Sequence, residues 1–128
     1  MVGQAESDSS ILAGCYNRIC NYSDKSVIVG GGWNKIYNSD KSTVVGGSRN
    51  RVEYHSDRSG VMSGCYNKVL DNSCLSAIVA GCCNIIDCDS CQSVIMGGCG
   101  NQIIDNNEGS VVLGGYLNSV CCNSDYSS

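Results

Sequence analysis

Hydrophobic and polar residues follow one fixed order that returns seven times along this chain. Each repeat opens with Ser, has Ile or Val two residues later, Gly five residues later and Asn eight residues later, and places a second Ile or Val ten residues after the Ser. The opening serines are Ser9, Ser26, Ser42, Ser59, Ser76, Ser93 and Ser110. Their spacing is 17 residues, or 16 between Ser26 and Ser42. A unit this short cannot bury a core alone, so successive units must stack on one another.

Within one repeat, counted from its Ser as position 1, the two aliphatic positions are 3 and 11. Short segments around β-branched residues, separated by Gly and Asn, are typical of two strands joined by tight turns. The pattern therefore predicts an all-β fold, a parallel β-solenoid or β-roll of about seven 17-residue coils. We expect positions 3 and 11 to form two facing Ile/Val ladders along the axis, and the Asn at position 9 to form a hydrogen-bonded ladder beside them.

The repeats occupy nearly the whole chain. We expect an N-terminal lead-in over residues 1–8, the solenoid over residues 9–126 and a C-terminal end at residues 127–128. The predicted coils span residues 9–25, 26–41, 42–58, 59–75, 76–92, 93–109 and 110–126. Repeat arrays normally carry distinctive capping units, and none is obvious in this sequence. We therefore expect the chain to be a piece of a longer one, truncated at its C-terminal end.

Position 4 of the first strand is large and apolar in every repeat. Its residues are Leu12, Val29, Val45, Met62, Val79, Met96 and Leu113. Strand alternation points them away from the face that carries position 3, so this strand needs burial on both faces. We predict self-association through this stripe, as a threefold bundle along the solenoid axis. The alternative is that both faces lie inside one wider coil.

The motif is similar to sequences of a known kind. Ser-Val-Ile-Val-Gly-Gly at residues 26–31, Ser-Val-Ile-Met-Gly-Gly at 93–98 and Ser-Val-Val-Leu-Gly-Gly at 110–115 resemble the head repeats of trimeric autotransporter adhesins. Similar arrays occur in repeat proteins of large DNA viruses and in phage fibres. The resemblance implies a left-handed parallel β-roll, a homotrimer and display on a bacterial or viral surface. The chain departs from the adhesin pattern in its longer period, its recurring Asn and its many cysteines.

Charge and hydropathy exclude some classes of binding partner. The formal net charge of −4 disfavours nucleic acid. No apolar run approaches the roughly 20 residues that span a bilayer, so no membrane insertion is expected. The N-terminus has neither the basic start nor the apolar stretch of a secretory signal. The partner we expect is a further copy of the chain, in a homotrimer or filament.

Eleven cysteines fall into repeat columns. Cys65, Cys82 and Cys99 share position 7 of three consecutive coils, and Cys74 and Cys91 share position 16 of two. Stacked neighbours lie within disulfide range, so rung-to-rung bonds are candidates, most simply Cys74–Cys91, with Cys82 able to reach Cys65 or Cys99. The alternative is that all serve as small reduced residues.

A zinc cluster can be drawn from a few of these thiols, namely Cys82, Cys83, Cys88 and Cys91. However, these residues sit in columns set by the repeat, on different turns. We expect no metal and no cofactor.

Position 8 is a loop column with aromatic and cationic residues at Tyr16, Trp33, Arg49 and Tyr66. Aromatics beside Arg on an exposed edge suit contact with a glycan or a protein receptor. Packing against the next rung or a neighbouring chain is the alternative interpretation. Position 10 reads Arg18, Lys35, Arg51 and Lys68 in the same coils, a column that would attract an anionic glycan or phosphate or else extend into water.

Catalysis has no support in the sequence. His55 is the only histidine, and no nucleophile, base and orienting group can be assembled around it. We therefore predict a non-enzymatic, adhesin-like surface or fibre module for attachment or display at a virion or cell surface, with a cytosolic assembly left open. A self-assembling filament built by end-to-end stacking is the alternative function. An ice-binding face would need regularly spaced Thr, and Thr43 is the only one.

Overall fold

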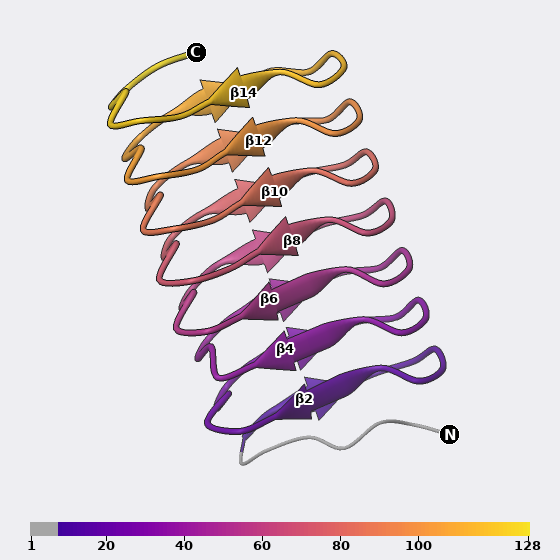
Figure 1. Cartoon of the computed structure of the whole chain (residues 1–128). Helices are drawn as coiled ribbons and strands as arrows, with labels where there is room; N and C mark the ends of the chain where they lie inside the picture. Colours follow the sequence, from indigo (N-terminus) through magenta and orange to yellow (C-terminus); the bar gives the residue numbers. More distant parts are fainter. Residues whose placement is uncertain (1–7) are drawn as a thin grey trace.

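The structure is a computed structural model that describes residues 8–128. Most of the predicted lead-in, residues 1–7, lies outside the described residues. Fourteen short strands form two seven-stranded sheets, and all the pairings between strands are parallel. The chain winds as a flattened column of stacked coils, with the first and last described coils at opposite ends (Figure 1).

Each coil gives one strand to each sheet. The first sheet contains β1 (Ser10–Ile11), β3 (Val27–Ile28), β5 (Thr43–Val44), β7 (Gly60–Val61), β9 (Ala77–Ile78), β11 (Val94–Ile95) and β13 (Val111–Val112). The second sheet contains β2 (Arg18–Cys20), β4 (Lys35–Tyr37), β6 (Arg51–Glu53), β8 (Lys68–Val69), β10 (Ile85–Ile86), β12 (Gln102–Ile103) and β14 (Ser119–Val120).

The register follows the sequence repeat. Ile11 pairs with Ile28 at an offset of 17, and Ile28 pairs with Val44 at an offset of 16. This confirms the predicted all-β solenoid of seven turns. The handedness and the trimer that the resemblance implies stay predictions.

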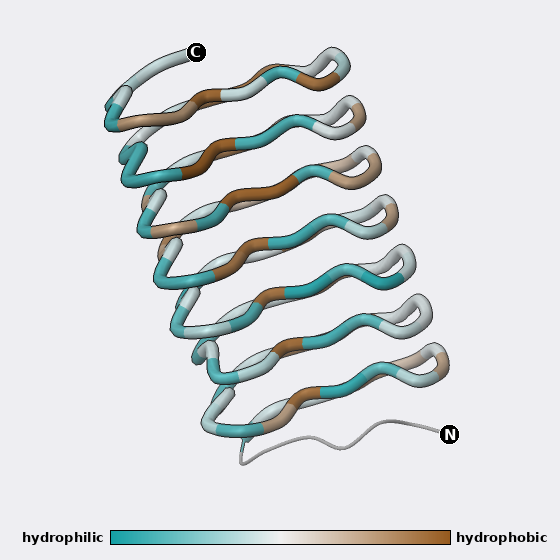
Figure 2. Tube along the Cα trace, in the orientation of Figure 1, coloured by the Kyte–Doolittle hydropathy of each residue, from teal (hydrophilic) through white to brown (hydrophobic). Residues whose placement is uncertain are grey.

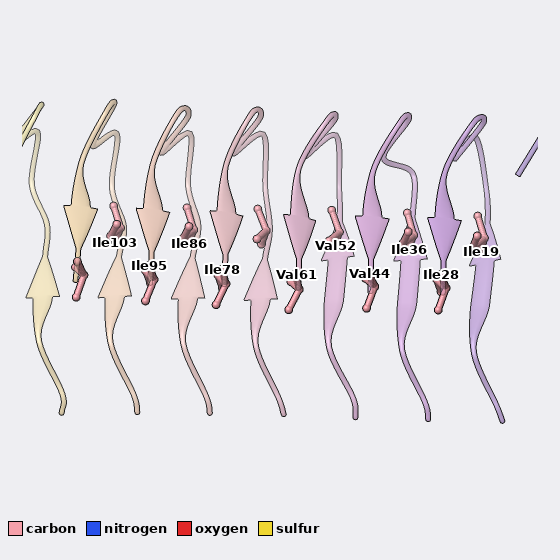
Figure 3. Close-up of a cluster of buried hydrophobic side chains, with 12 residues drawn as sticks. Ile19, Ile28, Ile36, Val44, Val52, Val61, Ile78, Ile86, Ile95 and Ile103 are labelled. Atoms are coloured by element: carbon pink, nitrogen blue, oxygen red, sulfur yellow. The ribbon is translucent and has the colours of Figure 1, made fainter. Parts of the chain in front are cut away.

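Two aliphatic ladders form the apolar core, as predicted. Figure 3 shows the side chains of positions 3 and 11 pointing toward one another between the two sheets. The core comprises Ile19, Ile28, Ile36, Val44, Val52, Val61, Val69, Ile78, Ile86, Ile95, Ile103 and Val112. In the first and last coils Ile11 and Val120 are only partly buried, because the described coils stack on them from one side. The hydrophobic segments accordingly recur at the same place in every coil (Figure 2).

The predicted Asn ladder is also confirmed, and its bonds are specific. In the fourth coil, Asn67 Nδ2 donates to the carbonyl oxygens of Ser63, 3.1 Å away in the same coil, and Gly81, 3.0 Å away in the next. Its Oδ1 accepts from the backbone N–H of Asn84 at 3.0 Å. One amide thus satisfies backbone groups on two coils, which offsets the cost of burying it.

Serine supplies two further ladders. Ser42 Oγ donates to the carbonyl of Ser56 at 3.1 Å and accepts from the backbone N–H of Ser59 at 3.2 Å. A second column, which the sequence analysis did not single out, lies near the end of each coil. It contains Ser23, Ser39, Ser56, Ser73, Ser90, Asn107 and Ser124. Buried polar columns therefore accompany the aliphatic ladders along the described coils, so the interior is specified by hydrogen bonds as well as by apolar packing.

Left-handed backbone turns close every coil. The position-6 glycines all have positive φ, as does every position-8 residue. After the second strand most coils have two consecutive left-handed residues, such as Tyr54 and His55, whereas the coil 26–41 has Asn38 alone. The 16-residue spacing is therefore a shortened turn at this corner, and both aliphatic ladders continue through it in register.

Candidate functional site

The position-4 side chains form a stripe along the outer face of the first sheet. Leu12 and Leu113, at the two ends, are 67% and 76% exposed, and Met62 in the middle is 47% exposed. Val29 and Met96 are also exposed, and Val45 and Val79 are half-buried. The alternative of a wider coil that encloses both faces is therefore wrong. We refer to the seven position-4 residues as the aliphatic stripe.

Position 2 widens this apolar surface. Val27, Ala77, Val94 and Val111 lie beside the stripe, half-buried, on the same face. Positions 2 and 4 contain no Asp, Glu, Lys or Arg in any of the seven coils. A continuous apolar surface of this kind is typical of a protein–protein interface.

The position-8 residues stack along the axis at the edge of the second sheet. The rings of Tyr16 and Trp33 are nearly parallel, with centroids 4.9 Å apart. In the next coil the Arg49 guanidinium lies 5.5 Å from the Trp33 ring centroid and 5.2 Å from that of Tyr66. Arg49 Nη1 also donates to the Tyr66 hydroxyl. We call Tyr16, Trp33, Arg49 and Tyr66 the aromatic stack. Packing against the next rung, one of the two interpretations of this column, is thus present, and ligand contact stays a prediction.

The position-10 cations lie on the outer face of the second sheet, two residues after the aromatic stack. In the middle coils they are organised by a carboxylate, Glu53, which is only 1% exposed. Its Oε1 lies 2.9 Å from Lys35 Nζ and 3.1 Å from Arg51 Nη2. These are ion-pair contacts without hydrogen-bond geometry. Because Lys35 and Arg51 are directly paired in the sheet, the buried carboxylate relieves their mutual repulsion.

The stack and the cation row enclose a shallow groove. Its volume is about 420 Å³, and it is lined by Trp33, Lys35, Arg49, Arg51, Tyr66 and Lys68. Tyr16 and Arg18, from the first coil, do not line it. The structure therefore joins two columns that the sequence analysis treated separately into one site across three coils.

Sequence reasoning missed Glu53. A carboxylate two residues after a position-10 cation, at the end of the second strand, is the signal that could have found it. Nothing in the sequence pattern showed that this carboxylate would be buried, because position 12 is otherwise a mixed column.

The cysteines are all free thiols in the structure. Cys74 Sγ and Cys91 Sγ donate to the backbone carbonyls of His55 and Asn72, each at 2.9 Å, which is the same contact repeated one coil apart. The Sγ atoms of Cys65 and Cys82 lie 3.2 Å apart. The disulfides drawn from Cys65, Cys74, Cys82, Cys91 and Cys99 stay predictions.

Cys82 is the most perturbed thiol. Its hydrogen bond with the Cys65 thiol, followed by that with the Cys83 thiol 3.3 Å away, raises its pKa from 9.0 to about 12. A thiol with so high a pKa stays protonated at neutral pH and is a poor nucleophile.

Within residues 8–128, no three or more His, Cys, Asp or Glu side chains gather in a way that could hold a metal ion. Nor does this part of the chain contain a helix long and apolar enough to cross a membrane.

The fold and these surfaces define a β-solenoid repeat protein with one apolar outer face and one aromatic and cationic groove. No protein-family model matches the chain, and no curated protein matches its sequence.

Proposed function

We propose that this chain is a non-enzymatic surface or fibre module, adhesin-like, in which three copies associate through the aliphatic stripe and present their second sheets outward for attachment or display. A virion or cell surface is the setting that suits such a module. The observation that carries the proposal is the exposure of an uncharged apolar face over all seven coils of the single chain.

Burial of the stripe supplies a driving force for association. Each fully buried aliphatic side chain contributes roughly 1.5–3 kcal/mol, so seven contribute on the order of 10–20 kcal/mol per chain as an upper limit. The strands that carry these side chains are already paired in a regular sheet, so association orders side chains but not backbone, at about 0.5–1.5 kcal/mol for each Leu or Met immobilised. The threefold arrangement itself is supported by the resemblance to adhesin head repeats.

A filament is the second candidate. Within residues 8–128, β1 and β2 pair with other strands on one side only, and so do β13 and β14. Unpaired strand edges at both ends of a parallel column are templates for head-to-tail addition of further copies. This assembly would be open-ended, whereas association through the stripe closes at a fixed number of chains.

Light scattering across a dilution series separates the two assemblies. A mass that stays at three chains over the series supports the trimer, and a mass that grows with concentration supports the filament. A mass of one chain at all concentrations overturns both.

The interface is tested with the triple variant Val29→Asp, Met62→Asp and Met96→Asp. These side chains are exposed in the single chain, so the variant should keep its β circular dichroism spectrum and become monomeric. Leu75→Asp is the control, because Leu75 is at least as exposed as these residues but lies at a corner of the coil and has a left-handed backbone that Asp tolerates. The stripe is not the interface if the triple variant stays trimeric or if the control also dissociates.

A further inference from the structure

We propose that the groove between the aromatic stack and the position-10 cations binds an acidic polysaccharide, a chain that carries carboxylate or sulfate groups at regular intervals. This inference rests on the proposed role in attachment, and it names the ligand class that the second sheet would recognise.

Charge is the first argument. Lys35, Arg49, Arg51 and Lys68 line the groove, and the buried Glu53 offsets only one of them. The remaining three positive charges stand on a chain whose net charge is −4. All eight Lys and Arg residues fall within residues 18–68, and none occurs in residues 69–128. The cations are therefore concentrated on the coils that carry the aromatic stack, which favours a local anion site over general attraction of polyanions.

The donors of the groove lie in rows along the axis. Successive coils repeat at the strand spacing of about 4.8 Å, so Lys35, Arg51 and Lys68 form a ladder of cations in register. A linear polymer that lies along the axis can place anionic groups opposite successive rungs. Such multivalent contact strengthens binding beyond that of a single ion pair, which at an exposed site is weak.

Ring orientation argues against a nucleic acid. Single-stranded nucleic acids stack their bases on free aromatic faces. Here Trp33 is covered by Tyr16 from the coil before it and by Arg49 from the coil after it. At Trp33 the stack therefore offers a ring edge rather than a free face, and the edge of an aromatic ring is its positive part. Anions and hydroxyl groups can contact such an edge, whereas a base needs a free ring face on which to stack.

Backbone pairing argues against an extended acidic peptide. Peptides that add to a sheet use the unpaired N–H and C=O groups of an edge strand. The strands beneath the groove are β4, β6 and β8, each of which is paired on both sides. A ligand in the groove thus finds no unpaired strand edge, which suits a polymer that is recognised through its anionic and hydroxyl groups.

Binding can be followed directly, because Trp33 is the only tryptophan and lines the groove. The full chain is titrated at low and physiological salt with heparin, which carries sulfate, with hyaluronate, which carries carboxylate, and with neutral dextran. Tryptophan fluorescence gives the dissociation constant, and light scattering on the same samples gives the number of chains.

We expect at least one acidic polymer to bind, dextran not to bind, and affinity to fall as salt rises. The double variant Arg49→Gln and Lys68→Gln should weaken binding by about tenfold or more, the loss expected when charge-assisted contacts are removed. Lys41→Gln with Arg58→Gln is the matched control, since these exposed cations lie outside the groove, and it should leave affinity within about twofold.

The proposal is overturned if neither acidic polymer binds, or if both double variants lose affinity equally. It is also overturned if single-stranded oligothymidylate or polyglutamate displaces the polysaccharide at a lower concentration than unlabelled polysaccharide does. The number of chains is measured separately, so a monomer that binds the polymer overturns the trimer alone, and a trimer that does not bind overturns the ligand alone.

Discussion

The side-chain amide of Asn67 and the carbonyl oxygen of Gly81, on successive coils, lie 3.0 Å apart, and the space beside this hydrogen bond is empty only because residue 64 is glycine. A Cβ on Gly64 would overlap the Gly81 oxygen and approach Asn67 Nδ2 to 2.8 Å. The repeating Gly and the repeating Asn therefore act together. The glycine adopts the left-handed turn and leaves space for the asparagine amide, which forms hydrogen bonds to two coils.

Substitution of Gly64 tests this arrangement. Gly64→Ala should lower the free energy of unfolding by about 2–4 kcal/mol. The new Cβ would overlap the next coil, and alanine is strained at the left-handed φ of this position. Gly46→Ala is the matched control, since a Cβ there meets no atom within 4 Å, and it should change stability by less than about 0.5 kcal/mol. Urea unfolding followed by circular dichroism measures both. Equal losses in the two variants would contradict the role given to position 6.

Removal of one amide from the Asn ladder should lower the free energy of unfolding strongly in the middle of the solenoid and weakly at its end. Asn67→Ala leaves the buried Asn84 N–H and the Ser63 carbonyl without this partner, whereas the Gly81 carbonyl still accepts from the Cys65 N–H, and we expect a loss of about 2–3 kcal/mol. Asn118→Ala, in the exposed last coil, should cost about 1 kcal/mol or less. If the two losses are similar in urea unfolding, the ladder is not the source of the stability.

Glu53 should matter through the charges that it separates. Glu53→Gln leaves Lys35 and Arg51 as paired like charges, so we expect the free energy of unfolding to fall by about 1–3 kcal/mol at low salt. High salt should recover part of this loss, because screening weakens repulsion between groups that are partly exposed. Asp89→Asn, at an exposed turn, serves as the control and should show neither effect. A loss that salt does not change would indicate packing rather than charge.

The Cys82 thiol should be slow to react at neutral pH. Its pKa of about 12 keeps it protonated, so the rate of alkylation by iodoacetamide should rise only as the pH approaches that value. In the Cys65→Ala variant the largest cause of the raised pKa is gone, and Cys82 should react about tenfold faster or more at pH 8. Peptide mass spectrometry after timed labelling measures the rates. An unchanged rate in the variant would show that the hydrogen bond with Cys65 is not what raises the pKa of Cys82.

The same shift has a consequence for stability. The folded state favours the protonated thiol, so the contribution of Cys82 to folding is complete below its ordinary pKa of 9.0 and is lost as pH rises from there toward 12. The Cys65→Ala variant should lose this part of the alkaline pH dependence.

The sequence was sufficient to predict the coil and its aliphatic and Asn columns, because every repeat has the same type of residue at the same position. Ile28 and Ile36 could be placed in the core from the period alone, and the outward direction of Met62 followed from strand alternation. The second Ser column was missed because Asn107 interrupts it and the short coil shifts Ser39 by one position.

The groove was harder to foresee, since it depends on features that do not repeat. The burial of Glu53 arises from neighbours in one part of the column, and the stacking of Arg49 between two rings requires side-chain conformations that spacing cannot give. The period of the repeat tells which residues share a column. It does not tell which columns come together in three dimensions to form a groove.

The single left-handed residue at Asn38, where the other coils have two, shows that this corner can differ in length while the ladders on either side stay aligned. A chain that tolerates the loss of one residue there has a natural site for additions as well. Descendants of this sequence could gain loops at that corner, one coil at a time, and so acquire new recognition elements without redesign of the column that carries them.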